Sequence, residues 1–362
     1  MFRKIIKYTS LLINLFFVLL YVCGLLSSVI PADKFVWFSY LGLIFPFLIV
    51  AQIGFVIFWI TRKKWLFLIS LGVLVASFPA VNRVFTLPFH KNHPITEEKP
   101  IVKLLTYNVA IFGGEKEFKN IMNVIEEADA DIVCLQEFGF YTSHNLLTEY
   151  QILSRLRKHY PYKHLWYKNQ RDNVSWGVAT FSKYPIINKN KVEYTSDYNV
   201  SIYSDVVIAS DTIRVFNNHL ESNKFTMRDV KHYKSLSDDF SREKFWLITE
   251  KLSYKLGAAY RVRAQQARAV RASIEESPYP VVVCGDFNDV PQSYAYRTIA
   301  KNLDDIETTT SWGYNYTFHA NGMFVDIDHV LVSQQKITPL HYSVIRESYS
   351  DHYPVLTEWQ VK

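Results

Sequence analysis

The sequence predicts an α/β domain of packed strand and helix layers, preceded by a membrane anchor of about three transmembrane helices. Two observations lead to this prediction. Residues 1–82 consist mainly of long uncharged apolar runs, and a run of about twenty apolar residues spans a bilayer as a helix. From residue 101 onward, short apolar runs alternate with segments of helical character, which is typical of layered α/β proteins.

Three segments are expected to span the membrane. They are the uncharged stretches at residues 11–30, 35–61 and 65–82. The third is short for a helix that needs about twenty residues to cross the hydrocarbon core. A signal peptide is the alternative for the first segment, because basic residues precede it. The two further apolar runs and the lack of a small-residue cleavage pattern argue against that alternative.

Lysine and arginine are distributed unevenly around these segments. Residues 1–82 hold seven of them and one acid, Asp33, so this region accounts for the whole formal net charge of +6. The basic residues lie before the first segment and at positions 62–64, between the second and third. Because basic loops stay in the cytoplasm, we expect a multi-pass protein of the plasma (inner) membrane with residues 83–362 on the extracytoplasmic side. The orientation reverses if the third segment only lies in the interface.

The rest of the chain divides into a linker and a catalytic domain. Residues 83–100 combine three prolines with polar residues and are interpreted as the linker. Residues 101–362 then form the catalytic domain. Its expected strands are 101–109, 131–137, 176–182, 213–220, 280–288 and 327–333, and its expected helices are 115–130 and 224–276.

Polar side chains stand at or just past the ends of these apolar runs. They are Asn108, Glu137, His219, Asp286, Asn288, Asp351 and His352. Ligands of α/β proteins usually bind at such strand ends. Any one of these residues, taken alone, has a structural explanation as a turn residue or a solvated strand end. Their number in one domain favours a functional site.

These residue types indicate hydrolysis of a phosphate ester with the help of a hard cation. Mg²⁺ prefers oxygen ligands and needs only one or two protein carboxylates, which Glu137 with Asn108 would supply. A histidine beside a carboxylate has a fixed tautomer and a raised proton affinity. The sequence has no Cys/His cluster at zinc spacing, no GxSxG motif and no glycine-rich phosphate loop. Zinc hydrolases, serine hydrolases and nucleotide-triphosphate motors are therefore disfavoured.

Seven segments follow one another in a recognisable order. They are TYNV (106–109), ADIVCLQE (130–137), GVATFSKYPI (177–186), NHLES (218–222), GDFNDVP (285–291), IDHVLVS (327–333) and SDHYPV (350–355). In order and spacing they resemble the endonuclease/exonuclease/phosphatase family, also called the deoxyribonuclease-I-like superfamily, over roughly residues 101–358. The resemblance implies a four-layer sandwich in which helices flank two packed β-sheets.

The resemblance also implies a metal site. Asn108 and Glu137 match the metal-binding positions of the family, and Asp351 matches a carboxylate that faces the metal region. The implied cofactor is Mg²⁺, with Mn²⁺ as a substitute. The implied reaction is in-line attack of water on phosphorus, with the cation neutralising charge that develops on a phosphate oxygen.

Five further residues match catalytic positions of the family. Asp286 matches the residue that orients or activates the attacking water, and Asn288 matches its neighbour that contacts phosphate. His219 matches a histidine that hydrogen-bonds the scissile phosphate. His352 matches the terminal histidine, and Asp328 matches the aspartate that pairs with it. Whether His352 acts as a base or as a cation is left open by the sequence.

One position departs from the family pattern. Many members have a basic residue just before the segment that corresponds to Ile327 and Asp328, whereas this chain has Asp326. Asp326 is either a solvated turn acid or an extra carboxylate of the metal region.

The resemblance does not define the substrate, because the family includes nucleases, sphingomyelinases, inositol-phosphate phosphatases and deadenylases. We expect a phosphodiesterase acting on nucleic acid. The alternatives are sphingomyelin-like lipid headgroups and inositol phosphates, and the lipid bilayer is the expected partner. Residues 224–271 hold twelve Lys/Arg against five acids and either contact substrate phosphates or form an ordinary solvated helical face. A catalytically silent binding module is the alternative from another functional class, and it would have lost some of the candidate site residues.

Overall fold

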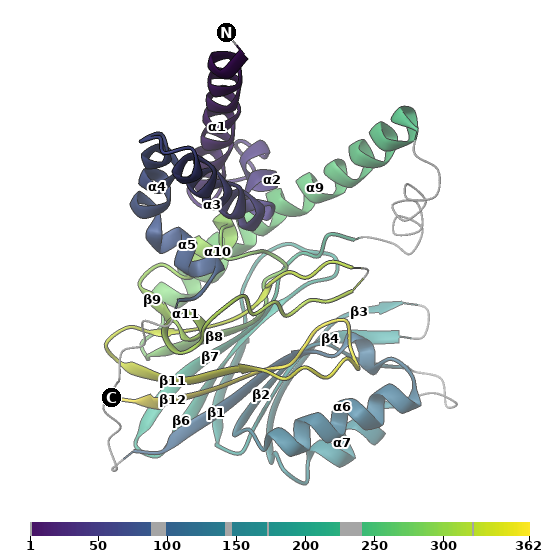
Figure 1. The fold of residues 1–362 in the computed structure, drawn as a ribbon. Coiled ribbons are helices and arrows are strands. Elements are labelled where there is room, and N and C mark those ends of the chain that lie inside the picture. The colour runs from purple at the N-terminus through teal and green to yellow at the C-terminus, as the bar shows by residue number, and fades with distance from the viewer. Residues whose placement is uncertain (1, 88–98, 142–146, 172–173, 225–240, 321) are drawn as a thin grey trace.

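The computed structural model describes residues 2–87, 99–141, 147–171, 174–224, 241–320 and 322–362. Two six-stranded β-sheets pack face to face, and helices cover their outer faces. The N-terminal helices stand beyond one side of this sandwich, next to α9 (Figure 1). This arrangement confirms the predicted pair of packed sheets with flanking helices.

The first sheet has the strand order β11-β12-β1-β2-β4-β3. Its strands are β1 (Ile101–Asn108), β2 (Ile132–Tyr141), β3 (Tyr162–Arg171), β4 (Val174–Ser182), β11 (Ile337–Val344) and β12 (Val355–Val361). The central strands β1 and β2 are parallel, and the other neighbouring strands are antiparallel.

The second sheet has the order β5-β6-β7-β8-β10-β9. Its strands are β5 (Ile186–Lys191), β6 (Ser201–Ile208), β7 (Asp211–His219), β8 (Val281–Asp286), β9 (Leu303–Asp305) and β10 (Asp328–Ser333). Here β7 and β8 form the central parallel pair, and the other neighbours are antiparallel. Each sheet therefore has one parallel pair at its centre.

Alternating side chains of the central strands fill two different cores. Val102 and Leu104 of β1 lie between the two sheets, whereas Leu105 and Tyr107 pack under α6 and α7 on the outer face. Helices α9 and α10 pack on the outer face of the second sheet. The helices of this region are α6 (Glu115–Ala128), α7 (Glu149–Leu156), α9 (Arg242–Glu275), α10 (Tyr294–Ile299) and α11 (Ile306–Thr310), with a 3-10 helix at Ala110–Phe112. Successive side chains of a strand point to opposite faces of its sheet. Each central strand therefore contributes both to the core between the sheets and to the core under the helices.

All six predicted strands are present, and so is the helix predicted at residues 115–130. The helix predicted at 224–276 is present as α9 from Arg242 onward, and residues 225–240 lie outside the described residues. Six strands are present that the sequence analysis does not predict, namely β3, β5, β6, β9, β11 and β12.

The N-terminal region contains five helices. They are α1 (Phe2–Leu26), α2 (Trp37–Leu43), α3 (Phe45–Thr61), α4 (Phe67–Ala76) and α5 (Phe78–Val84). Within the described residues, only α1 is by itself long and apolar enough to cross a membrane. The pairs α2/α3 and α4/α5 bend by 67° and 76° at their junctions and qualify only if each bent pair is one span. Of the three predicted spans, α1 is therefore a clear candidate, and the other two correspond to bent helix pairs.

The bends have a cause in the sequence. Pro46 and Pro79 lie in the first turns of α3 and α5. Proline has no backbone N–H and clashes with a preceding helical turn, so it begins a new helix more readily than it continues an old one.

The N-terminal helices contact the helical layer that α9 and α10 form on the outer face of the second sheet. Ser27 Oγ donates a hydrogen bond to the carbonyl oxygen of Gln292 at 2.5 Å, and Arg83 donates to the Gln292 side chain at 3.0 Å. Asp33 forms an ion pair with Arg268 of α9 at 2.5 Å. These contacts hold the N-terminal helices against α9 and the loop before α10.

The predicted linker at residues 83–100 falls largely on residues 88–98, which lie outside the described residues. Its first residues are not free, because Thr86 forms a β-bridge with Gly313. The domain boundaries remain predictions.

Gly285→Ala tests the close approach of β7 and β8. Gly285 has a φ of +125°, and a Cβ there would lie 2.1 Å from the carbonyl oxygen of Asn218. We expect the substitution to lower the free energy of unfolding by about 2 kcal/mol or more, measured by thermal or denaturant unfolding of the full chain in detergent. Gly313→Ala is the control, because Gly313 has a φ of +91° but no atom within 4 Å of an added Cβ. An equal loss of unfolding free energy in both variants would show that contact with Asn218 is not the cause.

Candidate active site

The two parallel strand pairs bring polar side chains to one edge of the sandwich. Asn108 ends β1 and lies opposite Gln136 of β2. His219 ends β7 opposite Asp286 at the end of β8, and Asp328 begins β10 on the other side of Asp286. The carboxyl ends of parallel strands meet at the same edge, so this register gathers residues that are far apart in the sequence.

Asp286 is the most heavily hydrogen-bonded member of this group. Its carboxylate accepts bonds from Asn108 Nδ2 at 3.0 Å, from the Asn288 backbone N–H at 2.7 Å and from Asn288 Nδ2 at 3.1 Å. The residue is 1% exposed. Burial raises the pKa of Asp286 to about 6, although the nearby His352 acts in the opposite direction. At neutral pH the group is a carboxylate that these hydrogen bonds hold in a fixed position.

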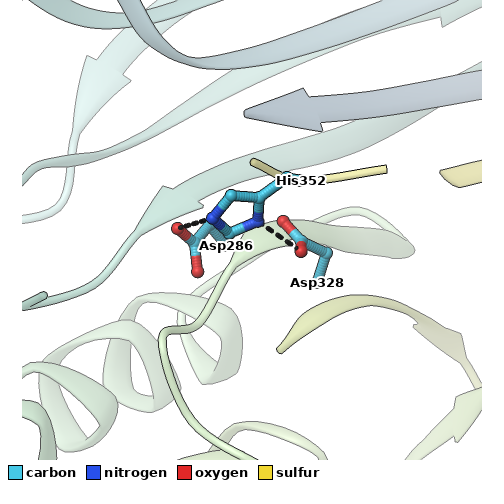
Figure 2. A group of neighbouring side chains, drawn as sticks. All are labelled: Asp286, Asp328 and His352. Atoms are coloured by element: carbon cyan, nitrogen blue, oxygen red, sulfur yellow. Dashed lines mark hydrogen bonds and ion pairs between the residues drawn. The ribbon is translucent and has the colours of Figure 1, made fainter. Parts of the chain in front are cut away.

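His352 is held between two carboxylates, as Figure 2 shows. Its Nδ1 donates a 2.7 Å hydrogen bond to Asp328, and its Nε2 lies 3.8 Å from Asp286 Oδ2. Burial by itself lowers the pKa of His352, but the charges of Asp328 and Asp286 outweigh burial and raise that pKa to about 10. The ring is therefore a cation at neutral pH.

His219 has an unused nitrogen that faces the same centre. Its Nε2 lies 3.7 Å from Asp286 and 3.8 Å from Glu137, beyond hydrogen-bond distance of both. This atom is buried and has no hydrogen-bond partner within the described part of the chain. Burial lowers the pKa of His219, so a neutral ring is available to contact a ligand.

Glu137 owes its position to a β-bulge. The register between β2 and β4 shifts between Gln136 and Phe138, and Glu137 has a φ of +48°. Such a bulge turns one side chain out of the regular alternation of a strand, and a non-glycine residue in this region stores backbone strain. The Glu137 side chain is 34% exposed, so it reaches the edge of the site from within a buried strand.

The residues predicted to bind a metal offer a suitable set of donors. Burial and the charge of Asp351 raise the pKa of Glu137, whereas the nearby His352 and Asn108 act in the opposite direction. The side-chain oxygen of Asn108 accepts a bond from Ala110 N at 3.1 Å and has a second lone pair. An all-oxygen set of this kind fits Mg²⁺ or Mn²⁺.

A second group of possible ligands consists of Asp286, Asp328 and His352, whose ligand atoms lie within 4.8 Å of one another. The Asp328–His352 contact of 2.7 Å is a hydrogen bond. Two ligands of one tetrahedral ion, each about 2.1 Å from it, would lie about 3.4 Å apart. The geometry favours a hydrogen-bonded pair at this position.

Supporting residues of the site were not identified from the sequence. Ser350 Oγ donates to the carbonyl oxygen of Asn108 at 2.7 Å. Arg263 of α9 is 1% exposed, forms an ion pair with Asp289 at 3.1 Å and donates to the carbonyl oxygen of Glu221 at 2.7 Å. The loop that follows Asp286 is thereby tied to α9. Asp289, the second aspartate of the GDFND motif, is the sequence feature that could have indicated a buried basic partner.

The basic stretch at residues 224–271 is partly neutralised within the protein. Among its described residues, arginines form the ion pairs Arg263–Asp289, Arg268–Asp33 and Arg271–Glu275. Arg263 is buried against the loop after Asp286, Arg268 pairs with the N-terminal region, and Arg271 pairs within α9.

Asp326 is buried, at 4% exposure, so its interpretation as a solvated turn acid is wrong. Its carboxylate lies 3.7 Å from His329 Nδ1.

Comparisons with known proteins agree with the fold. Residues 105–352 match the endonuclease/exonuclease/phosphatase family, and residues 3–84 match a domain of unknown function. A search of curated proteins found no match.

Three similar solved structures illustrate the likeness. An endonuclease/exonuclease/phosphatase family protein from Leptotrichia buccalis has 14% identity and a TM-score of 0.51, covering 72% of this chain and 99% of that one. One from Beutenbergia cavernae has 15% identity and a TM-score of 0.50, covering 72% of each chain. TDP2 from D. rerio, complexed with a single-strand DNA product, has 13% identity and a TM-score of 0.50, covering 72% of this chain and 98% of that one. At these identities the likeness shows the fold.

Arg263→Met tests the support of the loop after Asp286. Removing the guanidinium leaves Asp289 buried without its partner, and breaking a buried ion pair in this way costs about 3–5 kcal/mol. We expect a loss of that order in the free energy of unfolding, measured in denaturant. Arg261→Met on the same helix is the control, because Arg261 is exposed and its loss should cost less than about 1 kcal/mol. Similar losses in the two variants would show that the buried pair contributes little.

Proposed function

Because the chain belongs to the endonuclease/exonuclease/phosphatase family, whose members are hydrolases of phosphoesters, we propose that it is a membrane-anchored, divalent-metal-dependent phosphodiesterase that cleaves nucleic acid. The observation that carries this proposal is the buried carboxylate of Asp286, placed between His219 and His352 at the edge where both parallel strand pairs end. The proposed catalytic residues are His219, Asp286, Asn288, Asp328 and His352, and the proposed metal ligands are Asn108, Glu137 and Asp351.

The proposed mechanism is in-line attack of water on phosphorus. Asp286 accepts a hydrogen bond from the attacking water and orients it, because Asn108 and Asn288 already fix the carboxylate. His352 is held as a cation by Asp328 and stabilises negative charge on the phosphoryl oxygens. His219 donates from its unused nitrogen to the same group. Mg²⁺ bound by the proposed ligands would supply further neutralisation of a phosphate oxygen.

Nucleic acid is the first substrate to test. The solved structure of D. rerio TDP2 with a single-strand DNA product supports it, since that protein shares this fold.

Lipid headgroup diesters are the second candidate, and a specific observation favours them. Gln292, six residues after Asp286, is bound by Ser27 and Arg83 of the N-terminal helices. A membrane anchor in direct contact with this loop would place the catalytic edge close to a bilayer surface.

Substitution of Asp286 or His352 tests the mechanism. We expect Asp286→Asn and His352→Gln to lower kcat by at least about 10²-fold, the usual contribution of a positioned acid or base, with little change in thermal stability. The measurement uses the full chain in detergent with Mg²⁺, against linear DNA, RNA, sphingomyelin micelles and inositol phosphates, each with an EDTA control. Asp304→Asn, a partly exposed acid of β9, should retain full activity. Wild-type activity in both site variants would reject the assigned site.

The anchor and its orientation have a separate test. We propose that α1 and the two bent pairs each cross the plasma (inner) membrane, which leaves the catalytic domain (101–362) on the extracytoplasmic side of an anchor (1–82) and a linker (83–100). Protease added to right-side-out membrane vesicles should then digest the catalytic domain. Protection of this domain until the vesicles are opened would reverse the orientation, and release of the chain by high salt alone would exclude the anchor.

A further inference from the structure

A second group of ionisable side chains lies away from the candidate active site. Glu307 of α11, Asp326 and His329 of β10 each offer one ligand atom, and these atoms lie within 4.8 Å of one another. The three residues are 4%, 4% and 1% exposed. Asp328 and His329 are neighbours in β10, so their side chains point to opposite faces of the sheet. Asp328 faces His352, whereas the His329 ring packs against Phe287 and Tyr296.

The imidazole of His329 has the tautomer that a metal ligand needs. Its Nε2 lies 3.0 Å from the carbonyl oxygen of Asp289. A carbonyl oxygen only accepts hydrogen bonds, so Nε2 carries the proton and Nδ1 presents a lone pair. Nδ1 is buried without a hydrogen-bond partner in the described part of the chain, 3.7 Å from Asp326 Oδ2. Histidine ligands of metals usually donate their other N–H to a carbonyl or carboxylate in this way.

Other polar atoms around this point are also unsatisfied. Asp326 Oδ1 and the Tyr342 hydroxyl are buried without a hydrogen-bond partner in the described ranges. Glu307 accepts a hydrogen bond from Asn315 Nδ2 at 3.0 Å. Buried polar groups are almost always paired, and a cation bound here would pair these atoms.

The charges lead to the same conclusion. Glu307 and Asp326 are both buried, at 4% exposure each, and they offer ligand atoms within 4.8 Å of each other. Within the ranges that the structure describes, no lysine or arginine forms an ion pair with either carboxylate. Two buried carboxyl groups this close together need a shared proton or a cation between them, and a bound cation would also pair the unsatisfied atoms.

We propose that Glu307, Asp326 and His329 bind a divalent transition-metal ion of the Zn²⁺ type, distinct from the catalytic ion. One imidazole nitrogen with two carboxylate oxygens is a set that Zn²⁺ accepts readily, whereas Mg²⁺ and Ca²⁺ prefer oxygen alone. The 3.7 Å between His329 Nδ1 and Asp326 Oδ2 is a separation that two ligands, each about 2.1 Å from one ion, adopt.

The ion would connect α11 to a segment that borders the active site. Glu307 belongs to α11, and the segment 326–329 contains Asp328, which holds His352. His329 also binds the carbonyl oxygen of Asp289 in the loop after Asp286. An ion at this point therefore positions both Asp328 and the Asp286 loop without contacting substrate.

Metal content tests the site independently of catalysis. The full chain is purified in detergent with Glu137→Gln, which removes one carboxylate proposed for the catalytic ion. It is incubated with Zn²⁺, dialysed against metal-free buffer and analysed by mass spectrometry of its metals. We expect close to one Zn²⁺ per chain, and little or none when Asp326→Asn is added. Asp304→Asn, which changes a partly exposed acid of β9 in the same way, should leave the metal content unchanged.

Thermal unfolding provides the second readout. A ligand that binds only the folded state raises its unfolding temperature, so Zn²⁺ should stabilise the Glu137→Gln chain and not its Asp326→Asn derivative. If that derivative does not fold, His329→Gln replaces it. A Glu137→Gln chain that retains no divalent ion after exposure to Zn²⁺, Mn²⁺, Mg²⁺ or Ca²⁺ overturns the proposal. So does an Asp326→Asn chain with unchanged metal content, or one made more stable without metal, which would indicate a proton shared between Glu307 and Asp326.

Discussion

The hydrogen bond from Asn108 to Asp286 joins the last residue of β1 in one sheet to the last residue of β8 in the other. It forms because buried amides hold the two sheets in a fixed relative position. Gln136 Nε2 donates to Asn217 Oδ1 across the sheets at 2.7 Å, and Asn217 Nδ2 donates to the carbonyl oxygen of Ala179 at 2.9 Å. A slip of one sheet over the other would leave these amides unpaired in the core. The candidate site therefore depends on these buried hydrogen bonds between the otherwise apolar inner faces of the two sheets.

The sequence indicates the centre of the fold better than its borders, for a physical reason. Strands such as β1, β2 and β8 are buried on both faces and therefore appear as short continuous apolar runs. Strands β3 and β5 lie at the edges of their sheets and contain exposed residues. Tyr162–Arg171 and Ile186–Lys191 accordingly contain lysine and asparagine, and a search for apolar runs does not find them. The bends before α3 and α5 were marked by Pro46 and Pro79, but the apolar runs on both sides conceal them.

The same contrast applies to the candidate site. The candidate residues Asp286, which ends β8, and His352, which lies just before β12, belong to short motifs in which residue types and spacing are restricted. Residues that support them depend on long-range packing. Arg263 reaches Asp289 only because α9 crosses the second sheet, and the burial of Asp326 follows from the position of α11. No local pattern distinguishes such an arginine or acid from a solvated one.

The contacts around Gln292 have a consequence for how substrates reach the enzyme. A domain on a flexible tether samples a volume that grows with tether length, and its local concentration at a surface falls accordingly. Here the N-terminal helices form hydrogen bonds to the loop that follows Asp286. Under the proposed anchoring, the catalytic edge would therefore be held at a fixed distance from the bilayer and in a fixed orientation. A lipid diffusing in two dimensions would meet it at a constant angle, whereas a long polymer in solution would have to approach along the membrane plane. Access geometry, rather than affinity, would then select among phosphodiesters of equal chemical reactivity.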